Sequence, residues 1–435
     1  MTLLALDLMK LPNWLILTYL FVFGAFLGSF LNVCVYRFPK HEGVWNQVKA
    51  IWGRSHCPRC NAEILARDNL PILGWLMRGG KCRSCNRSIS TRYPMIELCN
   101  GLLFVLVYMF ELPDGLHTGW AFQCVVEEEL GPQMVSAADV AWSAPVWMHV
   151  RYALHMIMIQ SLLVATLIDF EFRIIPTAST DPLTVFGIIA GSCFGQAFLV
   201  PVWFERDQGA FMALMPEWLQ WLDFTFDALK LANEHPHLHG FLVSATGAAV
   251  GALLIWGVRV MGTYVLRKEA MGTGDIALMA MIGAFLGWQP VVIIFFLAAL
   301  CAMGNALFGM IVRRETELAY GPYISLAAVL LILFWNRIWP NSRSYFDLGS
   351  GIFVIGLFMA VMLFVSLWVM QLGKRMLGIS LYEEDVESEW TQADSMLHYA
   401  GEKIDEQQGQ WKRPMWEGSL SGRGLKQNDV WRNGE

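Results

Sequence analysis

Long apolar runs separated by polar loops dominate this chain. Nine of them are predicted to be membrane-spanning helices, at about 14–36, 95–111, 148–169, 181–203, 240–266, 275–289, 290–312, 321–338 and 350–372. Several reach the roughly 20 residues that a helix needs to cross a bilayer. The sixth run is short and is interrupted by Gly283, Gly287 and Pro290, so we expect it to be tilted or re-entrant. The pattern predicts an all-α polytopic membrane protein with about eight to nine transmembrane helices.

The composition agrees with this pattern. Of the 435 residues, 55% are hydrophobic and only 16% are charged, with a mean hydropathy of +0.44. An ordinary soluble protein, in which roughly a quarter of the residues are charged, is thereby excluded. The segment before Trp14 has no basic start and the first apolar run is long enough to span, so we expect a retained helix and no cleavable signal peptide.

Charge in the connecting loops alternates along the chain. Segment 37–94 is rich in lysine and arginine, whereas segments 112–147 and 204–239 are predominantly acidic. The remaining basic loops fall on the same side as 37–94, and they carry Arg173, Arg267, Lys268, Arg313 and Arg314. The positive-inside rule makes that side the cytoplasm, with the N-terminus outside and the tail inside.

The same pattern divides the chain into four parts. Residues 1–36 form the first transmembrane helix, and 37–94 a cytosolic loop. Residues 95–372 form the main transmembrane domain with outer loops 112–147 and 204–239, and 373–435 a polar tail that we expect to be disordered. A partner-binding role for the tail is the alternative.

Four cysteines in the cytosolic loop have the spacing of a metal site: Cys57, Cys60, Cys82 and Cys85. Two C-x2-C turns supply four thiolates, which satisfy tetrahedral zinc and leave no open position. Disulfides are disfavoured in the cytosol, so zinc with a structural role is the preferred interpretation. Four reduced thiols or a redox pair are the alternatives. The basic charge of the loop follows from topology, with attraction to anionic lipid or an acidic ligand as the alternative.

Two acids at the edges of apolar runs are the candidate catalytic residues. Asp169 ends the third run shortly before Ile175-Pro176, and Asp275 follows Gly272-Thr-Gly274 at the start of the sixth. Each has an ordinary alternative: Asp169 as a helix-end acid facing head groups, and Asp275 as a helix cap. The two glycines permit close backbone approach at a cost in helix stability, which favours a functional loop.

Taken together, the two acids can hydrolyse a peptide bond. An ionised carboxylate takes a proton from water while a protonated one donates to the scissile carbonyl oxygen, and no metal is needed. The loop Gly272–Gly274 can let an extended substrate pair with its backbone. Both acids are predicted to lie at the cytoplasmic face.

Over residues 20–330 the sequence resembles the type IV prepilin peptidases, bifunctional leader peptidases and N-methyltransferases of the bacterial inner membrane. Five stretches in the family's order carry the resemblance: Gly28–Arg37; the cysteine loop with Asn69–Pro71 and Arg92–Leu98; Ile168–Pro176; Gly272–Asp275 with Gly283–Trp288; and Tyr320–Tyr323.

The resemblance implies cleavage of a short basic leader from pilin-like or pseudopilin precursors at a glycine. It also implies methylation of the new amino terminus by S-adenosylmethionine. The family's catalytic aspartates fall on Asp169 and Asp275, and its zinc ligands on the four cysteines. Lysine is usual two residues after the second aspartate, where this chain has Ala277, and Asp or Asn is usual where it has Thr177.

The cofactor-binding residues stay unassigned, because no glycine-rich nucleotide fingerprint is present. Glu97 and Arg37 are candidates for the methyltransferase activity, with a salt-bridged helix-end role as the alternative for both. Two rival functions remain open: a peptidase whose zinc loop only binds substrate, and a channel or transporter whose acids line a pathway with zinc for gating. The expected partners are precursor proteins and membrane lipid, with no nucleic acid.

Overall fold

The computed structural model describes residues 12–57, 60–112, 145–203, 228–266, 271–312, 319–346 and 351–376, together with two short strands, β1 (Lys403–Asp405) and β2 (Gln410–Lys412). Almost all of the predicted outer loop 112–147, the larger part of the loop 204–239 and most of the tail after residue 376 lie outside the described residues. So do the basic residues predicted at 267, 268, 313 and 314.

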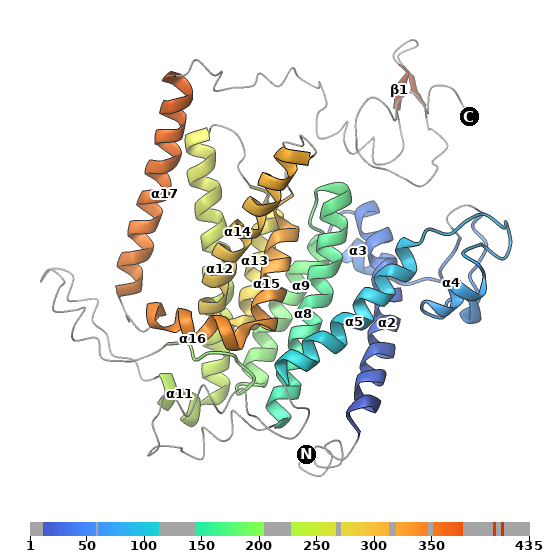
Figure 1. Cartoon of the computed structure of the whole chain (residues 1–435), viewed down its shortest axis with the longest axis horizontal. Coiled ribbons are helices and arrows are strands. Elements are labelled where there is room, and N and C mark those ends of the chain that lie inside the picture. The colour runs from blue at the N-terminus through green and yellow to red at the C-terminus, as the bar shows by residue number, and fades with distance from the viewer. Residues whose placement is uncertain are drawn as a thin grey trace, which may run out of the picture.

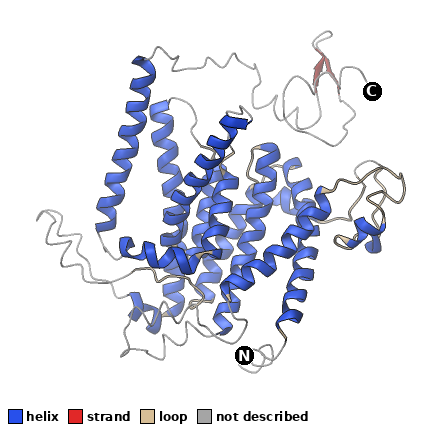
Figure 2. Ribbon diagram, viewed as in Figure 1, coloured by secondary structure: helices blue, strands red, loops and turns tan. Residues whose placement is uncertain are grey.

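Helices make up most of the described chain (Figure 2). Six of these helices are long and apolar enough to cross a membrane: α2 (Asn13–Arg37), α5 (Arg92–Glu111), α8 (Pro145–Phe172), α12 (Pro236–Leu266), α14 (Trp288–Val312) and α17 (Gly351–Met376). A bent pair, α15 (Gly321–Leu333) with α16 (Trp335–Phe346), makes a seventh candidate. The predicted all-α polytopic membrane fold is therefore confirmed, although fewer of the described helices qualify as full spans than the nine runs suggested.

Three predicted runs differ in extent from the helices observed. Helix α9 (Thr177–Cys193) begins directly after Pro176 and ends ten residues short of the predicted run at 181–203. Helix α13 (Thr273–Leu286) covers about 21 Å, less than the roughly 30 Å of a bilayer core, as expected for a short sixth run. The run 321–338 is not one helix, because the chain bends by 98° between α15 and α16.

The helices run alternately up and down in one bundle (Figure 1). Helices α8, α12 and α14 end at the upper end in this view, and α9, α13 and α15 begin there. Helix α16 and the short α11 (Ala228–Glu234) lie at the lower end, and α17 stands at the edge of the bundle. The starts of three helices and the ends of three others are thus gathered on one face.

The centre of the bundle is filled by apolar side chains of α8, α13, α14 and α15. Met158, Leu162, Met279, Ile294 and Ile324 are fully buried within it. Lipid is as apolar as these side chains, so close packing holds the helices together in a membrane.

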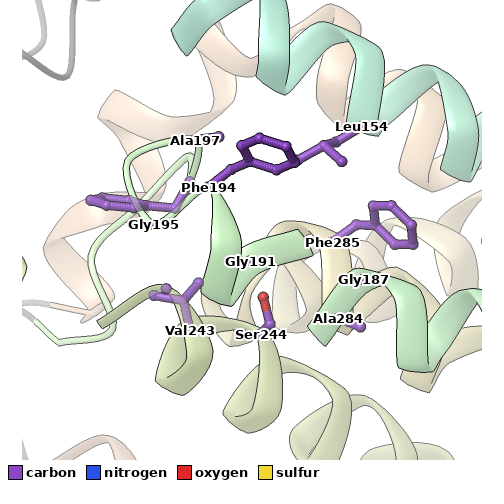
Figure 3. Close-up of a pocket in the computed structure, with 12 residues that line it drawn as sticks. Leu154, Gly187, Gly191, Phe194, Gly195, Ala197, Val243, Ser244, Ala284 and Phe285 are labelled. Carbon is purple, nitrogen blue, oxygen red and sulfur yellow. The ribbon is translucent and has the colours of Figure 1, made fainter. Parts of the chain in front are cut away.

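Glycines bring α12 into backbone contact with its neighbours. A Cβ added at Gly283 of α13 would lie 2.0 Å from the Gly247 carbonyl oxygen of α12. A small cavity between α8, α9, α12 and α13 is lined by Leu154, Phe194 and Phe285, among others (Figure 3). It lies towards the end of α9, whereas both candidate aspartates lie near that helix's start, so this cavity is not the candidate active site.

The cysteine loop is folded onto the end of α2. It contains η1 (Phe38–Lys40), α3 (Val44–Ile51), η2 (Ala66–Asp68) and α4 (Leu73–Met77). Arg37, the last residue of α2, donates hydrogen bonds to the carbonyl oxygens of Ala50 and Ile51 at 2.8 and 3.1 Å and to that of Arg54 at 3.0 Å. One guanidinium therefore fixes the chain beyond α3 to the end of α2.

Candidate active site

Asp169 lies in the last turn of α8, where the chain reverses. Arg173 adopts a left-handed conformation with φ 56°, and its amide donates to the Asp169 carbonyl oxygen at 2.9 Å, which closes the helix. Pro176 then caps α9. The predicted helix break at Ile175-Pro176 follows from proline's restriction of the residue before it.

Asp275 is the third residue of α13, and Gly272 is the residue that caps this helix. The Gly272 backbone amide donates a hydrogen bond to the Asp275 carboxylate. This hydrogen bond is half of a capping box, so Asp275 does help to cap α13, as the alternative interpretation predicts. Capping and chemistry are compatible here, because a carboxylate has several acceptor positions.

The structure brings the two acids together. Asp169 and Asp275 are 6% and 8% exposed, and their carboxylates lie close enough to interact electrostatically. They belong to the end of α8 and the start of α13, which meet at the upper end of the bundle (Figure 1). Two like charges sharing a buried site favour retention of a proton by one of them.

A third helix contributes backbone to this pair. Gly321, the first residue of α15, donates its backbone amide to the Asp169 carboxylate. A Cβ at this position would lie 2.6 Å from Asp169 Oδ2. The neighbouring Tyr320 lies within electrostatic range of Asp275. Neither Gly321 nor Tyr320 is among the predicted site residues, and their only signal in the sequence is the stretch Tyr320–Tyr323, which is part of the family resemblance.

The two glycines before Asp275 are not equivalent. A Cβ at Gly274 would lie 2.8 Å from the Cβ of Ile175, whereas the nearest atom to a Cβ at Gly272 is Asp275 Oδ2 at 3.5 Å. Close approach therefore requires glycine at position 274, where α13 packs on the segment after Asp169. Gly272 has φ −72°, which any residue can adopt.

The four cysteines form one cluster that could hold a metal ion. Their sulfur atoms all lie within 4.8 Å of one another, with Cys57 to Cys85 and Cys60 to Cys82 each at 4.0 Å. Four thiolates at a tetrahedral zinc ion would be roughly 3.8 Å apart. The donor set and the spacing therefore fit a closed tetrahedral site.

The residues that close the two C-x2-C turns have the same backbone geometry. Asn61 and Asn86, which follow the second cysteine of each turn, have φ 54° and 57°. Their amides donate to the carbonyl oxygens of Cys57 and Cys82 at 2.9 and 3.1 Å. Asparagine tolerates this left-handed conformation better than most residues. Hydrogen bonds from the backbone amides of Cys85 and Ser84 lower the pKa of Cys82 to about 6, which favours its thiolate. At Cys60 a backbone hydrogen bond from Ala62 lowers the pKa, but desolvation and the three neighbouring sulfurs raise it to about 11.

Arg37 and Glu97, the candidates for a methyltransferase role, are both used to hold the loop. Arg37 binds backbone carbonyls, as described above. Glu97 is 8% exposed and accepts a hydrogen bond from the Ile72 amide at 2.7 Å and another from Ser29. These contacts give both side chains a structural function, and neither is one of the predicted salt bridges.

The loop is also tied to the aspartate pair. Arg92, the first residue of α5, forms an ion pair with Glu171, two residues after Asp169, and its guanidinium lies 3.5 Å from the Leu167 carbonyl oxygen. Arg92 therefore connects the chain after Cys85 with the last turn of α8.

The fold and the site define a class of protein: a helical membrane protein with a buried aspartate pair at converging helix ends, beside a four-cysteine loop. Comparison with known proteins identifies the family within this class. Residues 22–110 match the bacterial peptidase A24 N-terminal domain, and residues 156–307 match the type IV leader peptidase family. Together the two models cover more than half of the chain. This protein belongs to the type IV leader peptidase family.

Several curated proteins are similar over most of their length. A type 4 prepilin-like proteins leader peptide-processing enzyme of Escherichia coli is 27% identical over 322 residues, covering 71% of this chain and 90% of that protein. Prepilin leader peptidase/N-methyltransferases of Aeromonas salmonicida and Pseudomonas aeruginosa are 28% and 27% identical, each covering 75% of this chain and 93% and 92% of their own. No solved structure matches the chain.

Proposed function

We propose that this protein is a membrane aspartic endopeptidase that removes the leader peptide from type IV prepilin-like precursors and then N-methylates the new amino terminus. The observation that carries the proposal is the buried pair Asp169 and Asp275, brought together from helices α8 and α13 in a chain of this family. The names of its relatives supply the substrate class and the second activity.

In the proposed reaction, one aspartate is ionised and removes a proton from the attacking water. The other is protonated and donates to the carbonyl oxygen of the scissile bond. The backbone amide of Gly321 holds the Asp169 carboxylate, and that of Gly272 holds the Asp275 carboxylate. Each hydrogen bond restricts the rotation of its carboxylate. Burial excludes bulk water from the pair and strengthens these interactions.

The four-cysteine site is proposed to bind zinc through Cys57, Cys60, Cys82 and Cys85. A closed site with four protein ligands stabilises a fold and offers no position for substrate. Zinc would therefore hold the two turns of the loop together. S-adenosylmethionine is the proposed methyl donor, on the strength of the relatives' names and the complete cysteine set, and we assign no residues to its binding.

The proposed location is the bacterial inner membrane, with the aspartate pair at the cytoplasmic face. The support is that the basic segment 37–94 and the ends of α8, α12 and α14 lie towards the same end of the bundle as the pair. Pilin-like or pseudopilin precursors and lipid are the proposed partners.

The test is incubation of the purified protein with a pilin-like precursor, with and without S-adenosylmethionine. Asp169→Asn and Asp275→Asn should each abolish cleavage while the protein remains in the membrane at normal level. Cleavage that survives either substitution would remove that aspartate from the mechanism.

The mass of the mature amino terminus separates the two enzymatic alternatives. A methylated terminus supports the bifunctional enzyme, and an unmethylated one supports a peptidase whose loop only binds substrate. Ion flux in proteoliposomes without any cleavage would favour a channel or transporter instead.

A further inference from the structure

Helix α4 in the cysteine loop turns large apolar side chains outward. Leu73 and Leu76 are each 58% exposed, and Met77 is 67% exposed. Trp75 points the other way: its ring nitrogen donates to the Ile89 carbonyl oxygen at 3.1 Å, and its ring packs on Gly80. The helix is therefore held in one orientation by Trp75, with Leu73, Leu76 and Met77 exposed on its outer side. Such a surface marks a contact with a partner or a membrane.

The start of α4 is anchored deep on the transmembrane helices. The Ile72 amide donates to Glu97 on α5 at 2.7 Å, while Ile72 itself has φ 59°, an unfavourable conformation for a β-branched residue. Next to Glu97 is Gly28 of α2, since a Cβ there would lie 2.8 Å from the Glu97 Cα. The Glu97 bond thus holds a strained backbone against α2 and α5.

This anchor sets the depth of α4. Gly28 precedes the last residue of α2, Arg37, by about two and a half turns, or about 14 Å along the helix. At the level of Gly28, α2 exposes Phe26 and Phe30, which are 51% and 43% exposed. Figure 1 shows α4 beside the upper half of α2, below the level of α3. Its apolar side is therefore at the depth of a surface of α2 that itself faces lipid.

We propose that α4 is a membrane anchor of the cysteine loop. Leu73, Leu76 and Met77 insert into the apolar edge of the leaflet that surrounds the upper half of α2. The exposed Lys81, four residues beyond the helix, reaches the phosphates of anionic head groups. Lipid is the occupant favoured over a protein, because the anchor at Glu97 places α4 at the depth of the exposed Phe26 and Phe30 of the membrane helix α2.

The experiment is photo-crosslinking of the full-length protein in nanodiscs of phosphatidylcholine and phosphatidylglycerol. Azidophenylalanine is introduced at Leu76, with Phe30 as the lipid-facing reference and Trp52 as the control. Trp52 is 84% exposed and caps α3 at the level of Arg37, the last residue of α2, because Arg37 binds the carbonyl oxygens of Ile51 and Gly53 on either side of it. Retained metal content shows that each variant is folded.

The proposal expects lipid adducts at Leu76 at a level comparable to Phe30 and several-fold above Trp52. In discs containing phosphatidylglycerol, Lys81→Gln should lower the Leu76 adduct, with no such change in pure phosphatidylcholine. A yield at Leu76 no higher than at Trp52 would overturn the anchor. Adducts at Leu76 to a second copy of the protein, or to an added precursor, would overturn lipid as the occupant. None of these outcomes depends on peptidase activity, so they are independent of the proposed reaction.

Discussion

Replacing Gly274 by alanine tests whether the contact between α13 and the segment after Asp169 sets the geometry of the aspartate pair. The added Cβ would lie 2.8 Å from the Cβ of Ile175, whereas carbon atoms in contact are normally about 3.5–4.0 Å apart. The start of α13 must therefore move by about 1 Å, and Asp275 is the next residue along. Overpacking of this kind costs about 1–3 kcal/mol.

A displacement of about 1 Å at a reacting group can lower a rate about a hundredfold. We therefore expect Gly274→Ala to lower the rate of leader cleavage by about 10- to 100-fold, mainly through kcat. Gly272→Ala is the matched control, because the same methyl group there would be 3.5 Å from its nearest neighbour. Alanine keeps the backbone amide that holds the Asp275 carboxylate, so Gly272→Ala should retain most of the activity.

The assay is cleavage of a pilin-like precursor by equal amounts of each variant, quantified in membranes and checked for metal content. Equal loss of activity in both variants would show that glycine is needed for loop mobility and not for close approach. Full activity of Gly274→Ala would show that the contact with Ile175 is unimportant for the reaction.

Three further predictions address the remaining contacts. Gly321→Ala would place a methyl group 2.6 Å from Asp169 Oδ2, so cleavage should fall at least tenfold at a normal membrane level of the protein; unchanged kinetics would contradict the proposed role of this backbone. Arg92→Glu should lower the rate of cleavage severalfold, since a partly exposed ion pair contributes at most about 1 kcal/mol. Adding Glu171→Arg to the same chain should restore part of the lost activity, and no restoration would exclude the ion pair as the cause. Cys57→Ser should lower bound zinc, measured by elemental analysis, and impair methylation, whereas an unchanged metal content would refute the four-cysteine site.

Local sequence patterns were enough to find the residues that lie at the proposed sites. The cysteine turns and the two acids at helix ends are short motifs, and their geometry is set mostly by neighbouring residues such as Asn61 and Gly272. Hydropathy was similarly sufficient for the helical membrane fold, since a bilayer demands long apolar helices.

What the sequence did not reveal depends on contacts between distant segments. Gly321 approaches Asp169 from a helix that begins about 150 residues later, and no local pattern encodes that approach. The bend between α15 and α16 was missed because the apolar run continues through Phe334. Helix α16 lies across the end of the bundle because Trp335 and Trp339 are buried in the main core and Phe346 packs on Trp288 of α14. The different roles of Gly272 and Gly274 likewise became visible only with Ile175 in place.

The ion pair of Arg92 with Glu171 changes how cysteine variants should be interpreted. A collapsed loop would release the guanidinium that steadies the final turn of α8, so a thiol far from the scissile bond could still slow proteolysis. Loss of both activities in such a variant would not place sulfur in either reaction. Only a variant that keeps the loop folded can separate a direct role of the thiol in a reaction from this indirect effect on α8.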